Sequence, residues 1–185
     1  GDDTAALMGR MTFNPLVHLD LMGTVILPLL GAPIGWAKPV PVQPHRFRPN
    51  ISMTWGMLLT AIAGPISNIV LAMIGMLMYA GATHFALNQP DAFDAAEHIL
   101  QRFILMNLGL AVFNMIPIPP LDGSRVVNHF LPHSLRPAWH QFEEFSFYIL
   151  MGVFLLLRQT HTNILAGPVI SLYKLLFWLA SPLMA

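Results

Sequence analysis

Asp122 is the residue whose type and surroundings most strongly indicate chemistry. It follows an apolar stretch that carries Asn107 and Asn114 and that ends in three prolines within residues 117–120. A carboxylate at membrane depth is costly, and prolines leave helix carbonyls in need of other partners. A stretch that accepts both features is typical of a polar site inside a membrane protein. The alternative role for Asp122 is to cap the short helix that the following residues predict.

Asn68 is a second polar residue in an apolar helix. Residues 56–83 carry no charge and are long enough to span a membrane with some tilt. Steps of three and four residues place a set of small residues on one helix face together with Asn68. The set is Ala61, Gly64, Asn68, Ala72 and Gly75. Small residues on one face predict close packing against another helix. Asn68 on that face indicates an interhelical hydrogen bond, a polar site, or both.

Two pairs of residues are spaced like metal ligands but have simpler interpretations. His18 and Asp20 follow an Asn-Pro pair, and we favour helix capping over metal ligation for them. His129 and His133 are four residues apart, as on one helix face, but Pro132 would disturb a helix that ran through both. We expect this second pair at the membrane interface.

The composition places these residues in an integral membrane protein. Of the 185 residues, 55% are hydrophobic and 10% are charged, whereas a soluble domain has about 25% charged residues. The mean hydropathy of +0.61 agrees with this assignment. The net charge of zero gives no indication of nucleic-acid binding. The chain has no cysteine, so any metal must be held by oxygen or nitrogen ligands.

The apolar stretches predict an all-α polytopic membrane protein with about four to five membrane helices. Prolines and glycines interrupt the stretch from Leu21 to about Trp36, which predicts a broken or re-entrant helix. Clearer apolar helices are expected at residues 56–83, 103–121, 145–157 and from 163 to the C-terminus. Between them we expect a short surface helix at 91–102 and an amphipathic connector at 137–144.

A short extended segment is expected near residues 35–50. Val40 and Val42 alternate with prolines, and prolines oppose a helix there. The pattern predicts an edge strand or β-hairpin that includes Val40, Pro41 and Val42. An ordinary loop explains the same residues equally well.

The segment before Asp122 resembles the signature of the site-2 protease family of intramembrane zinc metalloproteases. The family pattern, Asn-x-x-Pro-x-x-Pro-Leu-Asp-Gly, matches this chain from Asn114 to Gly123. The resemblance implies that Asp122 is the third protein ligand of a catalytic Zn²⁺. In the family the other two ligands and the catalytic glutamate lie in an H-E-x-x-H helix, and no H-E-x-x-H occurs in this chain. No catalytic residue is therefore expected within these 185 residues.

The first residues resemble the family segment Gly-Asp-x-Thr-Ala, into which the H-E-x-x-H helix runs. The matching residues are Gly1, Asp2, Thr4 and Ala5. We therefore expect the missing helix directly upstream of residue 1. On this expectation residues 1–185 are a single transmembrane domain, a piece of the protease core that is inactive without the upstream helix.

Two other segments extend the resemblance, which is to the compact bacterial type without PDZ or CBS domains. Residues 63–68 resemble a Gly-x-x-x-Asn element that faces the active site in the family, which implies that Asn68 and Asn114 orient substrate or a ligand. Residues 35–42 resemble a Gly-x-x-x-Pro-Val-Pro-Val segment. This implies that Val40, Pro41 and Val42 align the substrate by strand addition, which suits a substrate helix that must unwind before cleavage.

The resemblance implies a zinc-dependent endopeptidase that cleaves transmembrane segments, in regulated intramembrane proteolysis or in clearance of signal peptides. Its partners would be transmembrane protein substrates and the lipid bilayer. Basic residues in the loops at 36–55 and 122–144 predict that both loops are cytoplasmic, in a bacterial inner membrane, with the active site toward the cytoplasm. The alternative is a non-catalytic scaffold or a degenerate homologue of the same fold. A small transporter is disfavoured, because the sequence has no internal repeat.

Overall fold

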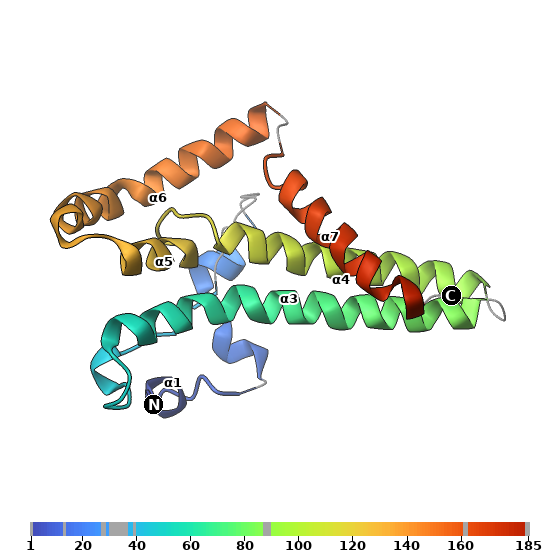
Figure 1. Cartoon of the computed structure of the whole chain (residues 1–185), viewed down its shortest axis with the longest axis horizontal. Coiled ribbons are helices and arrows are strands. Elements are labelled where there is room, and N and C mark those ends of the chain that lie inside the picture. Colours follow the sequence, from blue (N-terminus) through green and yellow to red (C-terminus); the bar gives the residue numbers. More distant parts are fainter. Residues whose placement is uncertain are drawn as a thin grey trace. The chain divides into compact units, whose positions relative to one another are not determined.

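The computed structural model describes residues 2–12, 14–26, 29, 37–38, 40–86, 90–160 and 163–183. The chain forms two compact units, Gly1–Met57 and Leu58–Ala185. All regular structure in the described residues is helical, which confirms the all-α class (Figure 1).

Before α3 begins at Met53, the described residues of the first unit form short helical turns. These are α1 (Thr4–Leu7), the 3₁₀ turns η1 (Pro15–His18) and η3 (Pro44–Arg46), and the π-helical η2 (Leu21–Ile26). The described residues of the expected hairpin at 35–50 form no strand, and η3 is their only regular element, so the hairpin is not confirmed. The physical reason lies in Pro41 and Pro44, which have no N–H to donate to a strand ladder.

The long helix α3 (Met53–Ala86) links the two units. Its 34 residues correspond to about 51 Å of helix. At its start the ring of Phe47 lies directly against the backbone of Gly56, where any side chain would collide with it. Residues Met53–Thr83 carry no charge and include an 18-residue window with a mean hydropathy of 2.0, so this helix is long and apolar enough to cross a membrane.

The second unit continues with α4 (Pro90–Asn114), α5 (Asp122–Phe130), the 3₁₀ turn η4 (His133–Leu135), α6 (Arg136–Gln159), α7 (Ala166–Ala180) and the 3₁₀ turn η5 (Ser181–Leu183). Residues Ala166–Leu183, with a mean hydropathy of 1.3, form the second candidate span. The described residues therefore contain two helices that meet the criteria of a span, and the expected number of four to five is not confirmed.

Two pairs of expected elements are each one helix. The surface helix at 91–102 and the apolar helix at 103–121 form the single helix α4, which ends at Asn114. The connector at 137–144 and the apolar run at 145–157 form the single helix α6. No proline interrupts either helix beyond its first turn, so the backbone hydrogen bonds continue across the change from charged to apolar sequence. Because the first halves of α4 and α6 carry charged residues, these two helices are not apolar enough along their whole length to count as membrane spans.

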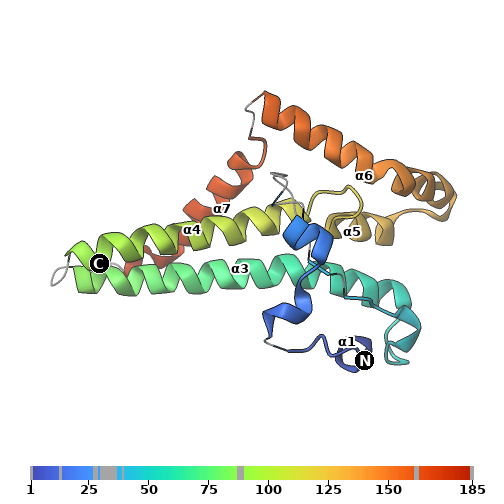
Figure 2. The same ribbon diagram turned by 180° about the vertical axis from the view of Figure 1, so that it is seen from behind.

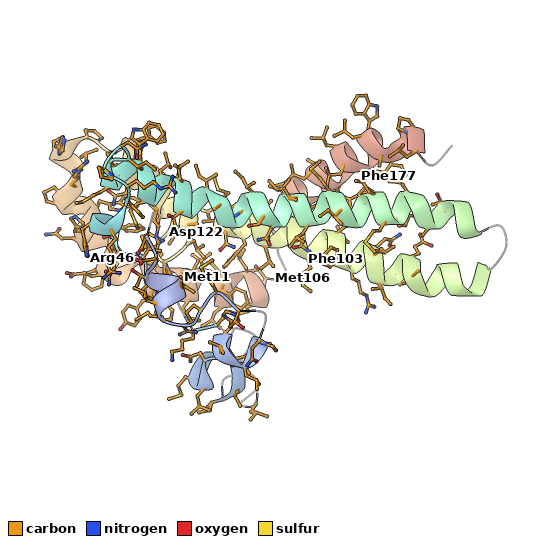
Figure 3. The ribbon with its side chains drawn as sticks, turned by 90° about the horizontal axis from the view of Figure 1, so that it is seen from below. Met11, Arg46, Phe103, Met106, Asp122 and Phe177 are labelled. Atoms are coloured by element: carbon orange, nitrogen blue, oxygen red, sulfur yellow. The ribbon has the colours of Figure 1, made fainter. Side chains whose placement is uncertain are left out.

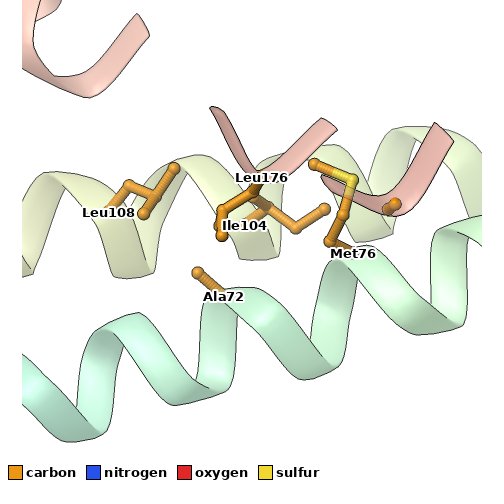
Figure 4. Close-up of a cluster of buried hydrophobic side chains, with 6 residues drawn as sticks. Ala72, Met76, Ile104, Leu108 and Leu176 are labelled. Atoms are coloured by element: carbon orange, nitrogen blue, oxygen red, sulfur yellow. The ribbon is translucent and has the colours of Figure 1, made fainter. Parts of the chain in front are cut away.

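Helices α3, α4 and α7 pack together around a small apolar core. In Figures 1 and 2, α3 and α4 run side by side and α7 crosses them. Figure 4 shows the core where they meet. It consists of Ala72, Met76, Ile104, Leu108, Leu176 and Ala180. Gly75 permits the close approach, because a Cβ there would lie 2.8 Å from Phe103 Cδ1 and 3.0 Å from Ile104 Cγ1. The predicted packing of the small-residue face is thereby confirmed.

Candidate functional site

A tight turn connects α4 to α5 and delivers the candidate ligand. After α4 ends at Asn114, the N–H of Ile116 donates to the carbonyl of Phe113 at 3.1 Å. The N–H of Leu121 then donates to the carbonyl of Ile118 at 3.0 Å, and the Pro119–Pro120 peptide bond is cis. The prolines prevent α4 from continuing, so the chain turns and starts α5 at residue 122.

Gly123 allows the start of α5 to lie directly on the end of α4. A Cβ at this position would collide with the carbonyl oxygen of Met115 and would lie 2.6 Å from that of Ile116. Ser124, which is buried, donates from its N–H and its hydroxyl to the carbonyl of Leu121, at 3.1 and 2.6 Å. The glycine and the serine together fix the first turn of α5 relative to α4.

Asp122 is the first residue of α5, and its carboxylate lies beside α3 (Figure 3). Its Oδ2 is 3.2 Å from the position that a Cβ of Gly64 would occupy. Leu121, not Asp122, stands at the N-cap, and in the described part of the chain no hydrogen bond or ion pair reaches the Asp122 carboxylate. The structure therefore does not show the capping role, and the carboxylate retains its capacity to bind a ligand.

Two effects act in opposite directions on the pKa of Asp122, which lies outside the two candidate spans. Partial burial raises the pKa of its carboxyl group above the ordinary value, and the guanidinium of Arg125 lowers it by a smaller amount. Burial favours the neutral form, whereas a bound cation favours the carboxylate. The site is thus one in which a metal ion would compensate for the cost of a half-buried negative charge.

The asparagines predicted to face the site have different surroundings. Asn68 is half-buried and lies four residues after Gly64, so it is on the same face of α3, about 6 Å farther along the axis. Asn114 is half-buried at the end of α4. Asn107 is buried, and its amide donates to the carbonyl of Phe103 at 2.8 Å, within its own helix. In the described residues, no hydrogen bond is formed by the side chains of Asn68 and Asn114.

The described residues do not contain a complete set of metal ligands. Within them no group of three or more His, Asp or Glu side chains is close enough to hold a metal ion. A catalytic zinc site uses three protein ligands. Asp122 fits as one of these, because it is an oxygen donor, half-buried and without another described partner. The remaining ligands would have to come from other residues.

Two pairs of residues are spaced like metal ligands. His18 and Asp20 take part in ordinary hydrogen bonds, and His129 and His133 do not share a helix. His18 Nε2 lies 3.0 Å from the carbonyl oxygen of Thr12, and the Asp20 carboxylate accepts from the N–H of Gly23 at 2.8 Å, at the start of η2. The capping interpretation of Asp20 is thereby confirmed. His129 lies in α5 and His133 in η4, so Pro132 does separate them as expected.

The residues of the expected substrate strand belong to the first unit, and Asp122 belongs to the second. Val40, Pro41 and Val42 have no regular secondary structure. The contribution of these residues to a site with Asp122 therefore stays a prediction.

An apolar cavity of about 340 Å³ borders the same turn. Ile116 and Ile118 of the turn line it together with α6 residues that include Leu150 and Phe154. None of the lining residues is titratable, and Asn163 is the one with a polar side chain. This cavity therefore offers no titratable group, whereas Asp122 lies at the start of α5, directly after the same turn.

Sequence reasoning missed the two glycines that hold Asp122 in place. The sequence indicated that Gly64 packs against another helix, but not that the Asp122 carboxylate lies beside it. Gly123 was noted only as the last residue of the Asn-x-x-Pro-x-x-Pro-Leu-Asp-Gly pattern. The available signals were a glycine directly after the aspartate and a glycine one helical turn before Asn68.

Comparison with known proteins gives two matches. Residues 81–157, which contain the α4–α5 turn with Asn114 and Asp122, match the family description "Peptidase family M50". A protein of Bacillus subtilis (strain 168) that bears the name "Putative zinc metalloprotease YwhC" is 36% identical over 156 residues, which are 83% of this chain and 68% of that protein. No solved structure gives a significant match.

Proposed function

Because the chain belongs to peptidase family M50, the site-2 protease family, we propose that it is part of a zinc-dependent protease that cleaves substrates within the membrane. In this protease the chain would contribute the aspartate ligand of the zinc ion. The observation that carries the proposal is the placement of Asp122. The turn after α4 holds its carboxylate against Gly64, on the glycine- and asparagine-bearing face of an apolar helix. A half-buried carboxylate without a described partner is costly, and this cost supports a functional site at Asp122.

In this proposal the remaining zinc ligands and the general base come from an H-E-x-x-H helix that precedes residue 1. Zinc bound there would lower the pKa of a bound water to about 7 and polarise the scissile carbonyl. Asp122 would hold one coordination position, and Gly123 and Ser124 would fix its direction. The amides of Asn68 and Asn114 would donate to carbonyl groups of the substrate, which finds no water to bond to at membrane depth.

The substrates in this proposal are transmembrane segments of membrane proteins. The two apolar helices, Met53–Thr83 and Ala166–Leu183, support a place in the bilayer. A substrate helix must unwind at the cleavage point, and Val40, Pro41 and Val42 would bind the unwound segment by strand addition. The basic loops support an orientation in which the site opens toward the cytoplasm of a bacterial cell.

The test is substitution of Asp122 in the protein expressed from its full reading frame and reconstituted in liposomes with a transmembrane substrate. Asp122→Ala and Asp122→Asn are expected to lower bound zinc and to reduce cleavage by roughly a hundredfold or more, since even groups that only support a ligand are worth 10- to 100-fold. Glu144→Ala, at an exposed carboxylate of α6, is the matched control and is expected to leave both unchanged.

Wild-type zinc content and cleavage in Asp122→Ala would refute the assignment of the ligand. A wild-type protein that binds no zinc and cleaves no transmembrane substrate would favour the alternative, a non-catalytic scaffold of the same fold.

A further inference from the structure

Asp2 joins two segments that are far apart in the sequence. Its Oδ2 accepts a hydrogen bond of 2.8 Å from the backbone N–H of Gln43, 41 residues away. Its Oδ1 accepts from the backbone N–H of Thr4 at 3.0 Å and from the Thr4 hydroxyl. The bonds from the Thr4 hydroxyl, the Gln43 N–H and the Thr4 N–H, in that order, hold the pKa of Asp2 at about 2. Asp2 is therefore a charged acceptor with both oxygens engaged.

A second, weaker contact joins the same two segments. Arg46, in the turn that follows Gln43, forms an ion pair of 3.1 Å with Asp3. Both side chains are well exposed, so this pair contributes little by itself. Asp2 is therefore the main attachment between the first residues and the segment around Gln43, which meet in the first unit (Figures 1 and 2).

The segment that Asp2 holds is attached at its other end as well. The N–H of Lys38 donates to the carbonyl of His18 at 2.9 Å. Between these two attachments, no hydrogen bond in the described residues reaches the backbone of Val40 or Val42. Val40 is 45% exposed. Among the described residues, the segment is thus bonded at both ends, and the backbone groups of Val40 and Val42 in its middle have no hydrogen-bond partner.

An extended backbone at residues 40–43 would place these groups on one edge of the segment. Residues that precede proline are restricted to extended conformations, which applies to Val40 and to Gln43; the φ and ψ of Gln43, −107° and 98°, are extended. In an extended chain, alternate residues direct their N–H and C=O to the same edge. One edge carries Pro41, which has no N–H, and Gln43, whose N–H is bonded to Asp2. The other edge carries the unpaired groups of Val40 and Val42.

We propose that Asp2 is a positioning residue that holds Gln43 so that the Val40/Val42 edge is presented to an extended peptide segment of the substrate. This inference rests on the proposed function. There the ligand helix precedes residue 1, so Asp2 connects the segment that follows the zinc ligands to the edge that receives the substrate. Asp2 itself touches neither zinc nor substrate.

The first experiment compares two variants of the full-length protein in liposomes. Asp2→Asn keeps the shape of the side chain but replaces one acceptor oxygen with a donor that would face an N–H. We expect kcat/KM for a transmembrane substrate to fall about tenfold, mainly through KM, with unchanged zinc content and faster amide exchange at Gln43. Thr4→Val, which removes the hydroxyl bond and leaves the Gln43 bond, is expected to stay within twofold of wild type.

A double-mutant cycle tests whether Asp2 acts through the edge. Val40→Pro removes one of the two N–H groups of the edge, that of Val40, and keeps an extended backbone. If Asp2 acts through this edge, Asp2→Asn in the Val40→Pro background lowers kcat/KM by less than twofold. A full tenfold effect in that background, equal losses in Asp2→Asn and Thr4→Val, or loss of zinc in Asp2→Asn would overturn the proposal.

The outcomes separate the two proposals. If cleavage does not depend on Asp122, the proposed function fails and the positioning role fails with it. If cleavage depends on Asp122 but Asp2→Asn is as active as wild type, only the positioning role of Asp2 is refuted.

Discussion

Substitution of Gly64 by alanine should decrease the affinity of the protein for zinc. Gly64 lies inside the long helix α3 and directly precedes Pro65. Glycine is about 0.8–1.0 kcal/mol less favourable than alanine inside a helix. The ring of the following proline crowds a Cβ at this position, so we expect the gain in helix stability to be smaller than that amount. The same Cβ would stand 3.2 Å from Oδ2 of Asp122, which is closer than an ordinary van der Waals contact of 3.4–4 Å.

The size of the functional effect follows from that distance. The carboxylate must move by a few tenths of an ångström to restore an ordinary contact. Metal–ligand distances tolerate changes of about ±0.2 Å, so the shift exceeds what a preformed site accepts. Loss of a group that supports a ligand costs 10- to 100-fold in metal affinity. We expect the low end of this range, about tenfold, because the added group is a single methyl.

The assay measures zinc affinity, cleavage of a transmembrane substrate and thermal unfolding on the same preparations. The control is Gly81→Ala in the same helix, because a Cβ at Gly81 meets no atom within 4 Å. Gly81→Ala, which no proline follows, should stabilise the helix by about 0.8–1.0 kcal/mol and leave zinc affinity unchanged. Our reasoning is refuted if Gly64→Ala binds zinc as tightly as wild type, or if Gly81→Ala weakens zinc binding equally.

Two further predictions follow from the contacts of single residues. Gly123→Ala should destabilise the protein by about 1–3 kcal/mol and lower its zinc content, because the added Cβ meets the rigid backbone carbonyls at the end of α4; an unchanged melting temperature would contradict this. The pKa of Asp2 is lowered in the folded protein from 3.8 to about 2, so its attachment to Gln43 is complete above about pH 4 and is lost as the pH falls through about 2. The amide resonance of Gln43 should titrate near pH 2 and should be flat in Asp2→Asn, whereas a midpoint near 3.8 would show that the bond is absent.

The sequence alone indicated the class of the protein and identified Asp122 as the candidate site residue. Apolar composition and helix-length runs are local properties, so they indicated an all-α membrane protein without any knowledge of packing. Asp122 was recognisable because a carboxylate is unusual directly after an apolar segment, and because it follows Asn114 and three prolines in a distinctive pattern. The small-residue face of α3 was also predictable, since helix periodicity places residues on a face whatever the partner helix is. The boundaries within α4 and α6 were not predictable, because a change from charged to apolar sequence does not end a helix.

The tertiary structure decided what each of these residues touches. Nothing local relates Gly64 to Asp122, 58 positions away, or Asp2 to Gln43, and only the packing of α5 on α4 and α3 turns Gly123 and Gly64 into the supports of the carboxylate. The physical reason is one of range. Helix formation depends on hydrogen bonds between residues four apart, whereas the position of a ligand depends on steric contacts between elements that the chain brings together only after they have formed.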